Sequence, residues 1–228
     1  MATVPLPSSA GAAVTIAMLL LAGGARADDL QKPARPDHVE GAPAAAPVTA
    51  TRRGGFTLGV DAGFGAANIT GYPNDVKKIG DPHWYTATGV RPTALVEAWV
   101  GGAIRDWFTF TLGVTSNFLF ATGNNDARSL GGMFHVEAFP LFALGDHLRD
   151  LGLRIDAGLG TAMVADPAGT KLVDGSLASI FGGGVFYEGL RAWKTAHGPF
   201  LMANYLWSNT VGRPAIFLGW RSVLYTGP

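Results

Sequence analysis

Charged side chains inside apolar, alternating segments are the part of this 228-residue sequence most able to carry chemistry. His135 and Glu137 are the most suggestive, because residues two apart in a β-strand point to the same face and can form an acid–base pair. With comparable positions in other segments, the set contains five carboxylates, two arginines and one histidine. Its members are Asp61, Glu97, His135, Glu137, Arg154, Asp156, Glu188 and Arg221.

We interpret this set as a network of salt bridges and hydrogen bonds in the interior of the fold, since charges in such apolar strands must pair or face water. The excess of carboxylates raises two further hypotheses, a protonated carboxyl or a bound cation. A narrow ion or small-solute channel is an alternative role for the same groups. No zinc-ligand spacing occurs, and we predict no catalytic residue, no metal site and no cofactor.

The elements that must position these groups are long β-strands. The stretch Phe108–Phe120 reads FTFTLGVTSNFLF, with apolar residues at six of its seven even positions and mostly Thr, Gly and Asn at its odd positions. Strict alternation predicts a strand with one apolar and one polar face. The stretch is also longer than the usual ~5–6 residues of a strand. Aromatic ends and uncharged polar residues between them are typical of a strand that crosses a membrane in a barrel.

The composition agrees with a membrane protein and argues against other classes. Charged residues make up 15% of the chain, against roughly 25% in soluble domains. The formal net charge is zero, which gives no electrostatic basis for binding nucleic acid. Cysteine is absent, so neither a disulfide nor a thiolate metal site can form.

The first 53 residues differ from the rest of the chain. Residues 1–27 are predicted to be a signal peptide, with an apolar run at Ala12–Ala22 and the small-x-small sequence Ala25-Arg26-Ala27 before the cleavage site. Residues 28–53 are rich in Pro and Ala and contain no aromatic residue, so we expect a disordered linker. The barrel domain is assigned to residues 54–228.

Eight alternating segments follow, separated by turn residues. We expect strands at 55–69, 92–104, 107–120, 130–144, 152–165, 177–192, 199–209 and 214–225. The faces of the second and sixth strands stay unassigned, because their alternation is weak. The connection at 70–91 is long and the turn at 105–106 is short, which is typical of membrane barrels with long outer loops and short periplasmic turns. Residues expected in membrane-interface belts are Trp99, Trp107, Trp193, Trp207 and Trp220.

The region from Gly55 to Tyr225 resembles the small eight-stranded outer-membrane barrels of Gram-negative bacteria, of the OmpA or OmpX type. The resemblance implies an all-β fold: an eight-stranded antiparallel up-and-down transmembrane β-barrel, preceded by a signal peptide and a disordered linker. It implies an outer-membrane location with the linker in the periplasm, and a monomeric state. The implied partners are outer-membrane lipids, lipopolysaccharide and the outer-membrane assembly machinery.

On this interpretation the protein has a structural, surface-interaction or adhesion role, a lumen filled by side chains and no enzymatic activity. Some barrels of this type modify lipid A, but no His-x-Ser pair accompanies His135, which strand 130–144 would place in the outer half of the membrane. The other alternative is a soluble periplasmic barrel of lipocalin type, with its apolar face turned inward around an apolar ligand. Such a barrel should carry Lys, Glu and Asp on its polar face, where Phe108–Phe120 carries Thr, Gly and Asn.

The first long loop, the connection at 70–91, is the best candidate for a binding surface. It combines aromatic and positively charged side chains, and loops held by a rigid scaffold commonly carry recognition. The alternative is that Trp84 and Tyr85 belong to the membrane-interface belt at the start of the second strand. The candidate binding residues are Tyr72, Lys77, Lys78, His83, Trp84 and Tyr85.

Overall fold

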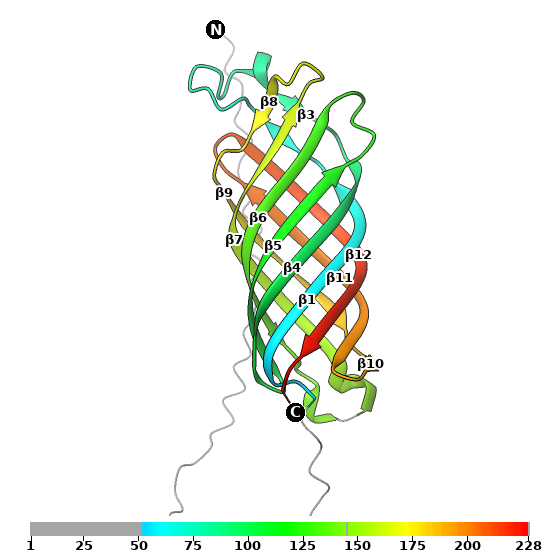
Figure 1. The fold of residues 1–228 in the computed structure, drawn as a ribbon. Coiled ribbons are helices and arrows are strands. Elements are labelled where there is room, and N and C mark those ends of the chain that lie inside the picture. The colour runs from blue at the N-terminus through cyan, green and yellow to red at the C-terminus, as the bar shows by residue number, and fades with distance from the viewer. Residues whose placement is uncertain (1–51, 145, 228) are drawn as a thin grey trace, which may run out of the picture. The chain divides into compact units, whose positions relative to one another are not determined.

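The structure is a computed structural model that describes residues 52–144 and 146–227. The predicted signal peptide, and the predicted linker up to residue 51, lie outside the described residues. Eight long antiparallel strands wind around a closed barrel (Figure 1). They are β1 (Gly55–Ala67), β4 (Arg91–Arg105), β5 (Phe108–Leu119), β6 (Asp126–Ala138), β7 (Leu151–Ala165), β9 (Ala178–Tyr187), β11 (Thr195–Trp207) and β12 (Val211–Tyr225).

Pairing between the first and last strands closes the barrel. β1 pairs with β12 from Thr57 opposite Tyr225 to Ala67 opposite Ala215, and each other long strand pairs with its neighbours in chain order. Closure leaves no long strand edge unpaired, which satisfies the backbone groups of all eight strands. The predicted all-β fold, an eight-stranded antiparallel up-and-down barrel, is confirmed.

Short elements occupy the connections at both ends. They are β2 (Thr70–Gly71), η1 (Pro82–Trp84), β3 (Thr86–Ala87), η2 (Phe142–Leu144), η3 (Asp146–Asp150), β8 (Lys171–Asp174) and β10 (Leu190–Ala192). We call the end where β1 begins and β12 finishes the terminal end, and the opposite end, which carries the connections 68–90 and 166–177, the loop end. No helix within the two described ranges is long and apolar enough to cross a membrane.

The apolar faces of the strands point outward. On β1, Leu58 and Val60 are about half exposed, whereas Thr57 and Asp61 are buried. Successive side chains of a strand point to opposite faces. In β5, the apolar even-numbered residues of the predicted stretch Phe108–Phe120 likewise point outward, and its odd-numbered residues point inward. Every one of the eight long strands contributes exposed large apolar side chains to this outer surface. These residues together form an apolar belt around the barrel.

The interior contains apolar as well as charged side chains. One buried apolar cluster includes Leu95, Met133 and Phe217. Trp99 is 2% exposed and also lies inside, so its predicted place in a membrane-interface belt is wrong. The other predicted belt tryptophans are exposed on the outside. Trp107, Trp193 and Trp207 lie at or beside strand ends, whereas Trp220 lies within β12.

The structure assigns the two faces that the sequence left open. In β4, the predicted second strand, Leu95 and Glu97 point inward and Val96 points outward. In β9, the predicted sixth strand, Ile180 points inward and Phe181 outward. Their alternation is weak in the sequence because apolar residues occupy both faces.

The fourth strand departs most from its predicted bounds. β6 ends at Ala138 rather than at residue 144, because Pro140 cannot donate a ladder hydrogen bond. The chain leaves the sheet at Phe139, whose buried ring contacts Phe186 edge to face with 5.3 Å between ring centroids. η2 and η3 follow at the terminal end, before β7 begins at Leu151. Other bounds also shift. β6 begins four residues before the predicted 130, β11 begins four before 199, β12 begins three before 214, and β9 ends five before 192.

Candidate functional site

Arg154 is the centre of one charged cluster inside the barrel. Its guanidinium donates to Asp61 Oδ2 at 2.7 Å, to Asp156 Oδ1 at 2.5 Å and to Glu97 Oε1. Nδ1 of His135 lies 2.7 Å from Asp156 Oδ1. All three carboxylates and the imidazole are at most 1% exposed. We call these five residues the Arg154 cluster.

Strand register brings this cluster together. Asp61 lies opposite Glu97 in the β1–β4 pair, and His135 lies opposite Asp156 in the β6–β7 pair. Directly opposed residues of an antiparallel pair share a face, where like charges repel. Arg154 reaches from β7 to β1 and β4 and offsets that repulsion, because one guanidinium donates to all three carboxylates.

Glu137 makes different contacts from His135. Both side chains point inward, as their spacing predicts, but Glu137 accepts a hydrogen bond from Arg221 Nη2 at 2.8 Å, whereas His135 contacts Asp156. The structure therefore forms no acid–base pair between His135 and Glu137. His135 lies three residues before Ala138, at the terminal end of β6, and not toward the loop end as strand 130–144 implied.

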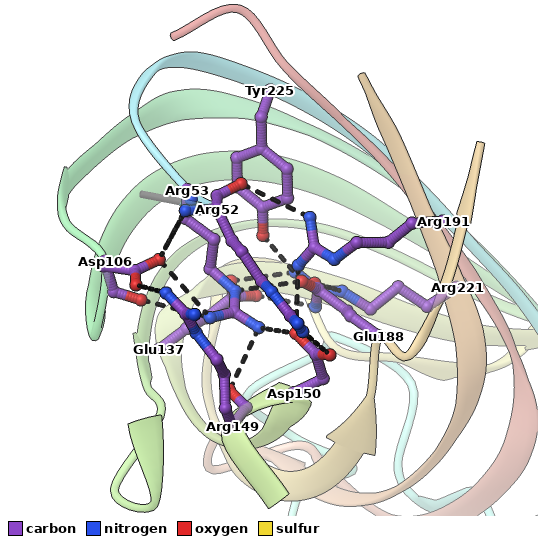
Figure 2. Close-up of polar contacts among 10 residues, drawn as sticks. All are labelled: Arg52, Arg53, Asp106, Glu137, Arg149, Asp150, Glu188, Arg191, Arg221 and Tyr225. Atoms are coloured by element: carbon purple, nitrogen blue, oxygen red, sulfur yellow. Dashed lines mark hydrogen bonds and ion pairs between the residues drawn. The ribbon is translucent and has the colours of Figure 1, made fainter. Parts of the chain in front are cut away.

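A second cluster closes the terminal end, with Arg53 at its middle (Figure 2). The Arg53 side chain is fully buried; Nη2 donates to Asp150 Oδ1 at 2.6 Å, and Nε lies 3.4 Å from Glu188 Oε2. Its guanidinium carbon is 3.5 Å from the centre of the Phe139 ring, a cation–π contact. We call this group the terminal cluster. Its members are Arg52, Arg53, Asp106, Glu137, Arg149, Asp150, Glu188, Arg191, Arg221 and Tyr225.

Arg221 connects the terminal cluster to the strands. Its Nε donates to Glu188 Oε1 at 2.8 Å, and the Tyr225 hydroxyl donates to Glu188 Oε2 at 2.8 Å. The Arg221 guanidinium carbon also lies 4.6 Å from the ring centroid of Trp99 and 4.1 Å from that of Phe186. Paired carboxylates and aromatic faces together offset the cost of burying this charge.

Asp106 fastens the end of the predicted linker to the barrel. Its Oδ1 accepts hydrogen bonds from the backbone N–H groups of Arg52 at 3.1 Å and Arg53 at 3.0 Å, and its Oδ2 accepts one from Arg149 at 2.5 Å. Burial alone would raise the pKa of Asp106, but the Arg149 hydrogen bond and the surrounding positive charges lower it below its usual value. Arg52 and Arg53, which precede the predicted boundary at 54, thus contact the barrel.

Sequence reasoning missed seven members of the terminal cluster. They lie before β1, in turns or at strand ends, where a period of two residues gives no signal. With them the two clusters contain seven carboxylates, six arginines and one histidine, so arginines outside the strand pattern balance most of the predicted carboxylate excess. The missed residues are Arg52, Arg53, Asp106, Arg149, Asp150, Arg191 and Tyr225.

The first loop gathers five of its predicted binding residues into three contacts. The rings of His83 and Trp84 meet edge to face, with 5.3 Å between ring centroids. Tyr72 and Tyr85 meet edge to face, with 5.3 Å between ring centroids. Nζ of Lys78 lies 4.2 Å from the ring centroid of Trp84. Trp84 and Tyr85 are 41% and 49% exposed and precede the start of β4, so they belong to the loop and not to the strand.

Two other predicted residues of this loop are also exposed, but the base of the loop is anchored. Lys77 and His83 are exposed to solvent. The Tyr72 N–H donates to the Thr210 carbonyl at 2.8 Å, and the Tyr72 carbonyl accepts from the Asp174 N–H at 3.1 Å. The first loop is therefore tied to the connections 208–210 and 166–177, two of the other three connections at the loop end.

The charged interior is well suited to filling a barrel. A space lined by Asp61, Arg154 and Arg221 has a volume of about 10 Å³, enough for roughly one water molecule. Among the residues that the structure describes, no group of three or more His, Asp or Glu side chains could hold a metal ion.

Comparisons with known proteins bear on the fold. No protein-family model and no curated protein matches the chain. Among solved structures, Neisserial surface protein A (NspA) aligns with a TM-score of 0.51 and 15% identity, over 75% of this chain and 97% of NspA. Ail, the attachment invasion locus protein of Yersinia pestis, aligns with a TM-score of 0.47 and 9% identity, over 74% of this chain and 98% of Ail. With its eight paired strands and the NspA match, the chain has the fold of the small eight-stranded outer-membrane β-barrels.

Proposed function

We propose that this chain is an integral outer-membrane protein with a structural and surface-interaction role and no catalytic turnover. The observation that carries the proposal is the apolar belt, to which every long strand contributes while the charged groups point inward. Soluble monomers rarely expose an apolar patch larger than roughly 300–600 Å². A lipid bilayer removes such a belt from water and leaves the closed hydrogen-bond ladder intact.

The outward apolar faces argue against the lipocalin-like alternative. Such a barrel needs its apolar strand faces inside, but Leu58 and Val60 are exposed and Asp61 is buried.

Fractionation tests membrane insertion. After a carbonate wash, the protein should stay in the outer-membrane pellet, and the unheated protein should migrate differently from the boiled protein on a gel. Release into the supernatant would contradict the proposal.

We propose further that the terminal end faces the periplasm and the loop end faces the cell exterior. The longest connection, 68–90, is at the loop end, and long loops face outward in such barrels. The connection 139–150 at the terminal end is also long, but Arg149 and Asp150 within it are buried.

Single cysteines test the orientation, because the natural chain has none. Val76 in the first loop is 89% exposed, and Leu144 at the terminal end is 67% exposed. A membrane-impermeant maleimide added to intact cells should label V76C, and should label L144C only after the outer membrane is opened. The reverse pattern would overturn the orientation.

The first loop is the proposed recognition surface, with anionic lipopolysaccharide as the favoured partner. The supporting observation is the exposed Lys77 beside Lys78 and Trp84, a combination of positive charge and aromatic surface. The double variant Lys77→Gln and Lys78→Gln should weaken binding of the purified protein to lipopolysaccharide vesicles. Lys171→Gln, which removes a lysine paired with Asp174 in another connection, is the control. Equal binding by the double variant and the wild type would reject this role.

The proposed lack of enzymatic activity toward lipid A can be tested separately. Lipid A from cells that express the chain should have the same mass spectrum as lipid A from cells that lack it. A new deacylated or acylated species that depends on the chain would contradict the proposal.

A further inference from the structure

A groove lies within the apolar belt on the outside of the barrel. It has a volume of about 540 Å³ and lies over β5, β6, β7 and the connection that leads to β9. Its walls include Val114, Leu130 and Leu177, which are 60%, 58% and 70% exposed. None of the residues that line it is charged. The volume falls in the range of about 300–1,000 Å³ that is usual for small-molecule sites.

The groove exists because Gly132 has no side chain at an outward position. Gly132 lies opposite Val114 on β5 and Leu159 on β7, and Leu130 and Phe134 flank it on its own face of β6. A Cβ added at Gly132 would meet nothing closer than the Gly113 carbonyl oxygen at 3.8 Å. Packing does not require a glycine here, so the missing side chain shapes the outer surface.

One edge of the groove is polar. Thr161 of β7, which lies opposite Leu130, and Ser176 of the following connection both line it. Within the described part of the chain, neither hydroxyl makes a hydrogen bond to another residue. Two free hydroxyls beside an apolar groove can donate hydrogen bonds to an amphiphile whose apolar tail ends in an acceptor, such as an ester carbonyl.

We propose that this groove binds one acyl chain of a bilayer lipid, with the tail along Val114, Leu130 and Leu177 and the ester carbonyl at Thr161 and Ser176. The inference rests on the proposed membrane insertion, because the groove belongs to the belt that would face lipid. A second copy of the chain fits less well: a stable protein interface buries at least about 1,200 Å² in total and takes roughly 20–30 residues from each partner, whereas eight residues line this groove.

Photo-crosslinking tests the proposal. The wild-type protein is reconstituted in vesicles that contain phosphatidylethanolamine with a diazirine on one acyl chain, irradiated and digested, and the labelled residues are mapped. Label should concentrate on Val114, Leu130 and Leu177, several-fold above the rest of the belt. In Gly132→Leu, which fills the groove, this excess should fall to the level of the rest of the belt.

The matched control is Gly102→Leu. Gly102 is also an outward glycine, on β4, where an added Cβ would come no closer than 3.6 Å to the Gly55 carbonyl oxygen, and it lies outside the groove. Its labelling should match the wild type. Uniform labelling around the inserted wild-type barrel would overturn the proposal. Failure of the protein to insert in a carbonate-resistant form would instead contradict the membrane location itself.

Discussion

Gly59 faces the barrel interior beside the indole ring of Trp99. A Cβ at position 59 would lie 2.1 Å from Cζ2 of that ring, well inside van der Waals contact. The ring cannot easily move away, because the Arg221 guanidinium lies against it. The inward glycine thus makes room for the largest side chain of the interior.

Gly59→Ala should therefore destabilise the folded barrel by about 1–3 kcal/mol, the usual cost of overpacking a tight core. Equilibrium urea unfolding of protein reconstituted in vesicles measures the change. Gly102→Ala, whose added Cβ meets only ordinary contacts, should change the unfolding free energy by less than about 0.5 kcal/mol. Equal effects of both variants would show that the contact with Trp99 does not matter.

Arg53 is a buried cation that several groups of the terminal cluster share. Arg53→Met removes a partner of Asp150 and Glu188 and should cost about 3–5 kcal/mol of unfolding free energy, as breaking a buried ion pair does. Arg128→Met removes a cation from an exposed pair with Asp126 and should cost less than about 1 kcal/mol. The same urea titration compares the two variants, and similar losses for both would contradict a structural role for Arg53.

At the scale of elements, the connection 139–150 and the turn at Asp106 act together at the terminal end. Asp106 accepts hydrogen bonds from Arg149 of η3 and from the backbone N–H groups of Arg52 and Arg53 ahead of β1. One carboxylate therefore joins the start of the barrel, a tight turn and a long connection.

The lowered pKa of Asp106 predicts an acid-sensitive terminal end. Its charged form is favoured in the folded protein, so the stabilisation is complete above the unfolded pKa of about 3.9 and is lost as pH falls through the lower folded value. Asp106→Asn should be less stable than the wild type at pH 7, and the difference should shrink below about pH 4. Urea midpoints measured from pH 7 to pH 3 test this; parallel curves would contradict it.

At the scale of the whole molecule, the side chains of the two charged clusters and the apolar interior fill the closed barrel. Eight strands enclose a space just wide enough for side chains or one small ligand. The space beside Asp61, Arg154 and Arg221 holds no more than about one water molecule.

We therefore expect the intact protein to stay at baseline conductance in planar lipid bilayers at neutral pH, in both voltage directions. Discrete channel openings that depend on the protein would contradict a filled lumen and favour the narrow-channel alternative. A porin preparation in the same bilayers confirms that the assay detects pores.

The sequence alone predicted eight strands, the sense of the faces in six of them and the closed eight-stranded fold. Alternation is a local property: once Leu58 and Val60 are apolar and Thr57 and Asp61 are not, the pleat sends the two sets to opposite sides. The strand register that pairs Asp61 with Glu97 follows only from the tertiary structure.

The tertiary structure also decided which charges meet and what closes the terminal end. Arg154 donates to carboxylates on β1 and β4, and Arg53 enters the interior from outside any strand. No periodic pattern in the sequence predicts either contact. The first depends on how the strands are staggered around the barrel, and the second depends on where the segment before β1 folds back. A local pattern can set the direction of a side chain, but its partner across a closed barrel is fixed only when the whole sheet closes.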